Sequence, residues 1–333
     1  MKELIMDITG VFGPAGDEGV IRDYITEKVK DYADDIKTDA MGNLIVYKKG
    51  ASSDKKLMFA AHMDSIGLMV TYIEDNGFIR FTTLGGISPA TIANQKVIFK
   101  NGLIGIVAHE GKDATAQGPM DKFYIDIGTF SKEETEELIE LGDTCVFYSP
   151  AVELANDCIS SPYLDNRLSC AILITALQNV ATPKYDTYYV FTTQEEVGLR
   201  GAKTAAFSIM PDMGIALDVT LTGDAIKPIR TMAVSLNGGA AIKVKDSSVV
   251  CSPRVKEMLV NTAKANDIKY QIEILEAGGT DTAAIQLTGA GILAGCISTP
   301  VRYVHSMSET ASLDDALCVE KLVEKVIEQG ADL

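Results

Sequence analysis

Two adjacent glutamates, Glu195 and Glu196, stand directly after the apolar, β-branched stretch 188–193 and shortly before Gly198. Because successive side chains of a strand point to opposite faces, a strand that breaks here lets the two carboxylates diverge. One carboxylate can then bind a metal ion while the other takes a proton from water, as metal-assisted hydrolysis requires. An isolated pair of glutamates is more often a solvated acidic turn, so the rest of the chain has to decide between the two interpretations.

Other potential metal ligands stand where apolar stretches end or where a helix begins. They are His62, Asp64, Asp165, Asp218 and His305. Ligands bind beyond the carboxyl ends of strands in open α/β sheets, so side chains from several strand ends can meet in one site. Imidazole and carboxylate groups suit zinc, cobalt or manganese, and a bridging carboxylate can hold two such ions roughly 3.5–4 Å apart. Taken singly, each histidine is more simply a satisfied polar residue, and Asp165 is more simply a helix cap.

Four apolar stretches predict the strands that position these side chains. They cover residues 56–61, 188–193, 213–217 and 292–297. Runs without polar alternation suit central strands of a sheet that is covered on both faces. Two shorter strands are predicted on either side of Met41-Gly42-Asn43.

Helices are predicted between the strands, where apolar residues recur at helical spacing. Asp17 is predicted to cap the helix that contains residues 20–32. Further helices are predicted after Asp165, from Ser252 with Pro253 at the first helical position, and from Ser312 to Gly330. Buried strands that alternate with helices predict an α/β domain.

The pattern changes between about residues 68 and 162. Short strand-like pieces alternate there with glycine turns, which is typical of a small β-rich domain. One helix is predicted to begin at Ser131, with Glu134 completing a capping box, and to run to Leu141 before Gly142. The predicted organisation is therefore an α/β domain of residues 1–67 and 163–333, with residues 68–162 inserted into it.

Composition excludes several classes of protein. The formal net charge of −16 disfavours nucleic-acid binding, because an acidic surface repels phosphates. We find no apolar run of about 18 residues that could span a membrane, and residues 1–7 contain acids where a signal peptide would be apolar. The six cysteines show no CxxC spacing, which disfavours a cysteine zinc site and favours buried thiols in a reducing cytoplasm.

These motifs, in this order along the chain, resemble metallopeptidase family 42, the glutamyl-aminopeptidase and TET-type dinuclear aminopeptidases. The resemblance covers essentially the whole chain, including the predicted insertion. It rests on Ala61-His62-Met63-Asp64, Leu164-Asp165-Asn166-Arg167, Thr193-Gln194-Glu195-Glu196-Val197-Gly198, Ala216-Leu217-Asp218, Gly278-Gly279-Thr280-Asp281 and Arg302-Tyr303-Val304-His305-Ser306. In the carboxypeptidase and deacylase branch of the clan the smaller domain is inserted late, before the final histidine, so that branch fits less well.

The resemblance implies a set of metal ligands. His62 and Asp218 would hold one divalent ion, Glu196 and His305 would hold the other, and Asp165 would bridge them. The ions would be zinc or cobalt, with manganese as an alternative. The implied fold is the mixed-sheet, phosphorylase/hydrolase-like α/β domain of dinuclear metallopeptidases, with a small PDZ-like or barrel-like insertion that serves dimerisation.

The resemblance also implies the catalytic residues. Glu195 would be the general base, and Asp64 would orient the ring of His62 without binding a metal itself. The substrate would approach the backbone closely at Gly278, Gly279 and Thr280, where there is little side-chain bulk. A plain turn into a helix explains these three residues equally well.

Three further residues receive structural interpretations. Arg167 is predicted to brace Asp165 or a neighbouring carboxylate, and His109 is predicted to lie at the surface or in an interface. Ser65 stands where the family often has another acid, which bears on substrate preference or local charge and leaves the ligand pattern intact.

The implied activity is removal of the first residue from peptides with a free N-terminus, by water activated between two metal ions with Glu195 as the base. The implied assembly is a dimer that builds a tetrahedral dodecamer in the cytoplasm. Two alternatives from other classes are a non-catalytic metal- or peptide-binding scaffold and a glycan hydrolase, whose carboxylate pair needs no metals. The preferred first residue, whether acidic, basic or apolar, and the native metal stay open.

Overall fold

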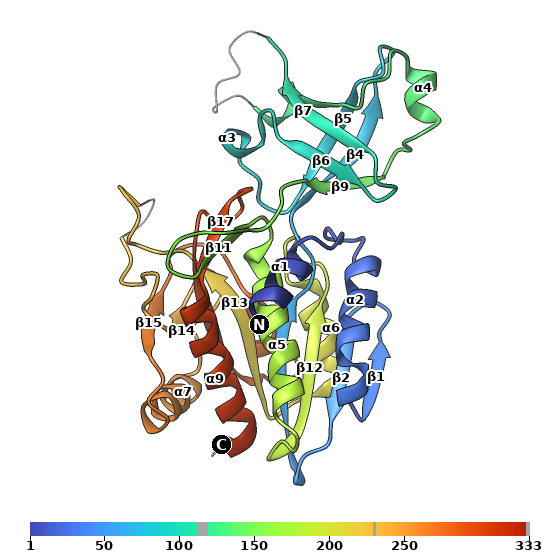
Figure 1. Ribbon diagram of the computed structural model, residues 1–333. Coiled ribbons are helices and arrows are strands. Elements are labelled where there is room, and N and C mark those ends of the chain that lie inside the picture. Colours follow the sequence, from blue (N-terminus) through green and yellow to red (C-terminus); the bar gives the residue numbers. More distant parts are fainter. Residues whose placement is uncertain (112–118, 229–230, 331–333) are drawn as a thin grey trace.

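The protein is described by a computed structural model, which covers residues 1–111, 119–228 and 231–330. Its largest element is a mixed sheet of eleven strands (Figure 1). These strands are β1 (Asp35–Thr38), β2 (Leu44–Lys48), β3 (Ser52–His62), β10 (Val152–Glu153), β11 (Cys158–Ser161), β12 (Tyr185–Thr192), β13 (Met213–Thr220), β14 (Ala240–Lys245), β15 (Tyr270–Ile274), β16 (Leu293–Arg302) and β17 (Glu309–Ser312). The order is β1-β2-β12-β3-β13-β16-β17-β11-β10, with β14 and β15 branching from β16.

The centre of the sheet is parallel, as the uninterrupted apolar stretches predict. Strand β12 pairs with β3, β3 with β13, and β13 with β16, all in parallel. Parallel neighbours bring their carboxyl ends to one edge of the sheet. In register, Thr192 lies opposite His62, so the residues that follow β12 begin level with the end of β3.

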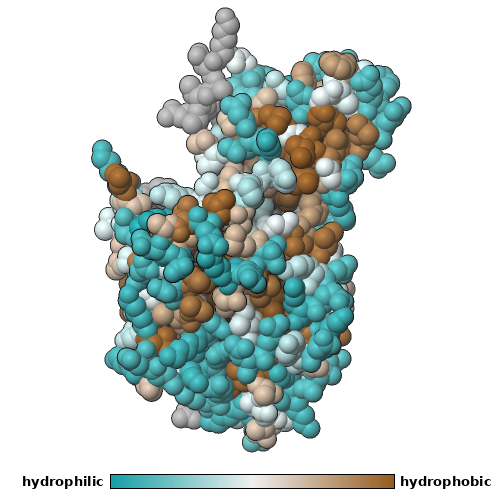
Figure 2. All heavy atoms as spheres, in the orientation of Figure 1, coloured by the Kyte–Doolittle hydropathy of each residue, from teal (hydrophilic) through white to brown (hydrophobic). Residues whose placement is uncertain are grey.

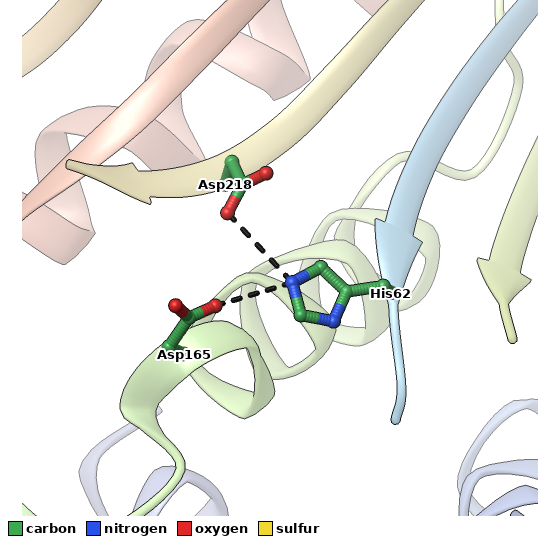
Figure 3. Close-up of side chains that lie close together, drawn as sticks. All are labelled: His62, Asp165 and Asp218. Carbon is green, nitrogen blue, oxygen red and sulfur yellow. Dashed lines mark hydrogen bonds and ion pairs between the residues drawn. The ribbon is translucent and has the colours of Figure 1, made fainter. Parts of the chain in front are cut away.

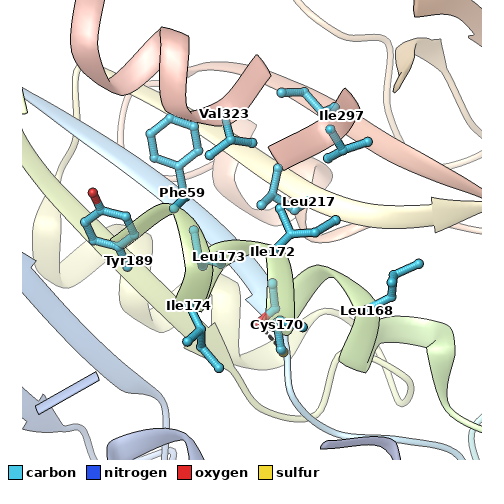
Figure 4. Packing of buried hydrophobic residues seen from close by; sticks show 14 of the residues in the cluster. Phe59, Leu168, Cys170, Ile172, Leu173, Ile174, Tyr189, Leu217, Ile297 and Val323 are labelled. Carbon is cyan, nitrogen blue, oxygen red and sulfur yellow. Dashed lines mark hydrogen bonds between the residues drawn. The ribbon is translucent and has the colours of Figure 1, made fainter. Parts of the chain in front are cut away.

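Helices cover both faces of this sheet. Successive side chains of a strand point to opposite faces, and alternate residues of each central strand are accordingly buried in different clusters. In β3, Phe59 packs with one large cluster while Met58 and Ala60 pack with another. The first face carries α1 (Lys2–Thr9), α2 (Gly19–Val29), α5 (Leu164–Asn179), α7 (Pro253–Ala265) and α9 (Leu313–Gln329). The second face carries α6 (Arg200–Ile209) and α8 (Asp281–Gln286). Figure 4 shows Tyr189, Leu173 and Val323 meeting in the first cluster.

Six further strands close into a barrel above the main sheet (Figure 1). They are β4 (Gly67–Ile73), β5 (Ile79–Leu84), β6 (Lys96–Phe99), β7 (Ile104–His109), β8 (Phe123–Asp126) and β9 (Thr144–Phe147). Two short helices, α3 (Pro89–Ile92) and α4 (Lys132–Glu136), and two 3₁₀ turns, Lys30–Tyr32 and Met120–Lys122, complete the fold. Of the two predicted forms of the β-rich part, the structure has the barrel. Strand β10 pairs with β11, and β11 pairs with β17, so both belong to the main sheet.

Two sequence expectations about helix ends are wrong. Asp17 does not cap α2; its carboxylate pairs with Lys100 at 2.6 Å, and Glu18 stands at the N-cap position. The helix that begins after Ser131 stops at Glu136 instead of reaching Leu141, and beyond it the Asp143 carboxylate accepts the N–H of Glu140. Ser131 caps this helix as predicted, accepting the N–H of Glu134.

Within the described ranges, no helix combines the length and the apolar content that crossing a membrane needs. All six cysteines are free thiols.

Candidate metal centre

Two predicted ligands lie on neighbouring parallel strands. His62 is the last residue of β3, and Asp218 lies near the end of β13, two residues beyond the last pair between these strands. Both side chains are buried. The distance from His62 Nε2 to Asp218 Oδ1 is 3.8 Å (Figure 3). The continuous apolar strands therefore deliver an imidazole and a carboxylate to the same point at the edge of the sheet.

Asp165 lies between the two histidines. Its Oδ1 is 3.1 Å from His62 Nε2, and its Oδ2 is 3.3 Å from His305 Nε2. Asp165 and Asn166 have non-helical backbone angles at the start of α5, so the carboxylate stands clear of the regular helix (Figure 3). Each oxygen of one carboxylate therefore faces a different imidazole.

The two glutamates occupy the turn that follows β12. Gln194 adopts a left-handed backbone with φ of 53°, which breaks the strand as the sequence predicts. Glu196 Oε2 lies 3.4 Å from His305 Nε2, and Glu195 Oε2 lies 3.9 Å from His62 Nε2. The two side chains thus diverge toward different histidines.

Asp64 holds this turn in place. Its carboxylate oxygens accept the backbone N–H groups of Glu195, at 3.0 Å, and of Glu196, at 3.2 Å. The ring of His62 is closer to the backbone of Asp64 than to its carboxylate: Nδ1 is 3.1 Å from the carbonyl oxygen and 3.7 Å from Oδ1. A contact at Nδ1 leaves Nε2 free to face Asp165.

A buried acid that sequence reasoning missed, Glu309, joins two other ligands. Its carboxylate accepts the N–H of Asp165 at 2.9 Å and the N–H of His305 at 2.7 Å. His305 has a left-handed φ of 60° and therefore lies outside any regular ladder. The only local signal is an acid four residues after the histidine, which by itself has no predictive value.

Within the described residues, two groups of side chains have the spacing of metal ligands. The first comprises His62, Asp165 and Asp218, and the second comprises Asp165, Glu196 and His305; within each, one ligand atom from every residue lies within 4.8 Å of the others. Asp165 belongs to both groups. All five predicted ligands are therefore brought together, and nitrogen and carboxylate donors suit zinc, cobalt or manganese.

The electrostatics of the site also fit bound cations. Burial raises the pKa of Glu195 well above its usual value, and the nearby charge of Asp218 adds to the effect. Burial likewise raises the pKa of Asp218, and it raises that of Asp64 to about 7. Glu196 Oε1 is buried without a hydrogen-bond partner among the described residues. Crowded, buried carboxylates of this kind are stabilised in their ionised form by cations.

Asp165 differs from its neighbours. Burial opposes its ionisation, but hydrogen bonds from His305 and His62 outweigh burial and hold the pKa of the carboxyl below its usual range. Burial lowers the pKa of His305, but hydrogen bonds to Asp165 and Glu196 outweigh this effect and raise it to about 12. The carboxylate that faces both histidines is thus held in its ionised form.

The site opens into a cavity of about 510 Å³. Gly278 and Gly279 line it, and Gly278 has a left-handed φ of 62° that favours glycine. Thr280 does not line it; this side chain is buried and its hydroxyl donates to Asp246 Oδ2 at 3.3 Å. Two of the three residues predicted for substrate approach therefore face the cavity.

The expectation that Arg167 braces a carboxylate is wrong. Its fully buried guanidinium donates to the backbone carbonyls of Val11, at 3.2 Å, and of Gly13, at 2.9 Å. Arg167 thereby anchors the loop between α1 and α2. His109 lies in the barrel, where its ring packs edge-on against the ring of Phe123 with 4.7 Å between the ring centroids. It belongs to neither ligand group.

Two histidines that share an aspartate, each with a further carboxylate, form the ligand arrangement of two-metal hydrolases. The family model of M42 glutamyl aminopeptidases matches residues 42–322. A provisionally named aminopeptidase of Acetivibrio thermocellus is 50% identical over 328 residues, which cover 98% of each chain.

Solved structures agree with this match. An aminopeptidase of the archaeon Desulfurococcus kamchatkensis has a TM-score of 0.95 at 36% identity, covering 99% of this chain and 94% of its own. The TET1 peptidase of Pyrococcus horikoshii has a TM-score of 0.89 at 33% identity, covering 98% and 99%. The chain belongs to the M42 aminopeptidase family: it is a metallopeptidase of that family, a hydrolase that acts on peptide N-termini.

Proposed function

We propose that this enzyme removes the first residue from peptides with a free N-terminus, using two divalent ions per subunit and Glu195 as the general base. The observation that carries the proposal is the position of Asp165, whose two oxygens face His62 and His305 separately. In this proposal His62 and Asp218 complete the first metal site, and Glu196 and His305 complete the second.

When bound, the ions supply a water of lowered pKa and polarise the carbonyl of the scissile bond. Glu195 Oε2 accepts the proton of the attacking water and returns it to the leaving amine. Asp64 keeps Glu195 in reach by holding its backbone N–H. Gly278 and Gly279 let the substrate backbone approach the wall of the cavity.

Zinc or cobalt is the proposed ion, with manganese as the alternative, because all three accept this donor set. The test uses protein stripped by a chelator and reloaded with each metal, and aminoacyl-chromophore substrates in free and N-acetylated form. We expect metal to restore cleavage of free-amine substrates alone. Cleavage of blocked substrates would indicate a deacylase or endopeptidase, and no cleavage by folded, metal-loaded protein would indicate a binding scaffold.

We also propose that residues 68–162 form an insertion whose barrel serves dimerisation and whose strands β10 and β11 join the main sheet. Residues 1–67 and 163–333 form the catalytic domain in this proposal, and dimers assemble into a tetrahedral dodecamer. The Pyrococcus horikoshii relative is described as able to assemble into a tetrahedron or a large octahedral shell. Large apolar side chains are exposed in the inserted segment: Ile104, Ile106, Phe130, Leu138 and Leu141. Figure 2 shows brown, apolar atoms gathered on one side of the barrel part. A mass near 35.7 kDa in light scattering would contradict assembly. The free thiols support a cytoplasmic location.

A further inference from the structure

The substrate cavity has two kinds of wall. One consists of the six ionisable side chains of the candidate metal centre. The other is apolar and is lined by Leu199, Val219, Leu221, Leu275, Ala277 and Val304. The first residue of a peptide must place its side chain in this cavity when its peptide bond reaches the centre. The chemistry of the second wall therefore selects that side chain.

The described residues that line the cavity include no lysine and no arginine. Two cations lie close by without lining it. Lys243 is near enough to influence the pKa of Asp218, but it is fully buried and pairs with Glu273. Arg200 is exposed, and its Nη1 donates to Gln194 Oε1 at 3.0 Å. Among the described lining residues, an acidic substrate side chain would thus meet no cation.

A basic substrate side chain also lacks a partner. The acids that line the cavity are Asp165, Glu195, Glu196 and Asp218. These are the proposed metal ligands and the proposed base, and their four charges balance two divalent ions. In the described part of the chain, no further carboxylate lines the cavity to pair with a lysine or arginine of the substrate. Burying a charged side chain without a partner is unfavourable, whereas an aliphatic side chain gains from apolar walls.

We infer that this enzyme is selective for a neutral aliphatic first residue, such as leucine or methionine, over glutamate and lysine. The inference rests on the proposed aminopeptidase function and specifies its substrate class. It differs from the glutamyl specificity in the description of the family model. Because the apolar residues come from four separate segments of the chain, the preference does not depend on which of them contacts the first side chain.

The test is a set of X-Ala-Ala tripeptides, with X as leucine, methionine, glutamate or lysine, hydrolysed by the full-length, metal-loaded protein. We expect kcat/KM for leucine and methionine to exceed that for glutamate and lysine by about 100-fold or more, the order that unpaired buried polar groups impose. Comparable or faster cleavage of the glutamyl or lysyl peptide overturns the inference and leaves the aminopeptidase function standing. Absence of cleavage for every peptide overturns the function and, with it, the inference.

Arg200 offers a matched control, because its Nε lies 3.8 Å from the point where a Cβ on Gly198 would stand, and Gly198 lines the cavity. Arg200→Gln should leave the ratio of leucine to glutamate cleavage unchanged. A rise of tenfold or more in that ratio would show that Arg200 recruits acidic side chains, which contradicts the absence of a cationic partner. Circular dichroism and metal content of the variant verify that only the charge has changed.

Discussion

Replacing Glu309 tests whether a buried carboxylate outside the ligand set controls metal binding. The Glu309 carboxylate accepts the N–H groups of Asp165 and His305, so it fixes the backbone of two ligands at once. Glu309→Gln keeps the shape and one acceptor oxygen, but it turns an NH₂ group toward the second N–H. One hydrogen bond to a charged group is lost, which costs about 1.5–3 kcal/mol.

We expect Glu309→Gln to lower the metal affinity of the two proposed sites by different amounts. Asp165 and His305 both belong to the group with Glu196, whereas the group with His62 and Asp218 contains only Asp165. Removing a group that orients ligands lowers metal affinity by about 10–100-fold. Competition titration with a chromogenic chelator should therefore show one site weakened by this factor and the other affected much less.

Asp315 supplies the matched control. Its buried carboxylate accepts two backbone N–H groups in the same way, from Asn237 and Gly239 at 2.7 Å each, but it touches no proposed ligand. Asp315→Asn should lower the free energy of unfolding by a similar amount without changing metal affinity. If Glu309→Gln unfolds like Asp315→Asn and still binds two ions with wild-type affinity, Glu309 supports the fold only, and the reasoning is refuted.

Three further substitutions test the site and its surroundings. Glu195→Gln should lower kcat by about 10²–10⁴-fold while elemental analysis still finds wild-type metal content; retained activity would exclude Glu195 as the base. Asp165→Asn removes the charge shared by both ligand groups and should reduce the metal content of dialysed protein at both sites, so the loss of a single ion would contradict a bridge. Lys243→Met leaves buried Glu273 unpaired and should lower the free energy of unfolding in urea by about 3–5 kcal/mol, whereas an unchanged midpoint would contradict a stabilising pair.

The central strands and the candidate site residues at their ends could be predicted because both depend on local sequence, whereas the grouping of these residues into two metal sites came from the family resemblance. A central parallel strand is a continuous apolar run, and the first polar residue after it stands at the edge where ligands bind. This rule leads directly to His62 and, with the break at Gln194, to the two glutamates. The barrel could be predicted only as a β-rich segment, because closure depends on pairing β4 with β9, which lie far apart in the chain.

Residues whose roles depend on long-range contacts could not be predicted. Glu309 reaches Asp165 across 144 positions of sequence, and Arg167 reaches Gly13 across 154. Neither contact leaves a local pattern. Arg167, which lies close to the proposed ligand Asp165 in sequence, was expected to pair with a carboxylate. Its guanidinium instead donates to backbone carbonyls of the irregular loop between α1 and α2. Backbone groups outside regular ladders still need partners when they are buried, and a long side chain can supply them.

Two turns that carry proposed site residues lie outside regular helices and strands. Buried carboxylates accept the backbone N–H groups of these two turns. Asp64 holds the turn of Glu195, and Glu309 holds that of His305. These acids add negative charge to a centre already crowded with carboxylates, so bound cations and ordered turns stabilise each other. Removing the metal should therefore speed amide exchange at both turns, while Gly239, held by Asp315, keeps its rate. Equal exchange in stripped and loaded protein would mean that the turns are ordered by the acids alone.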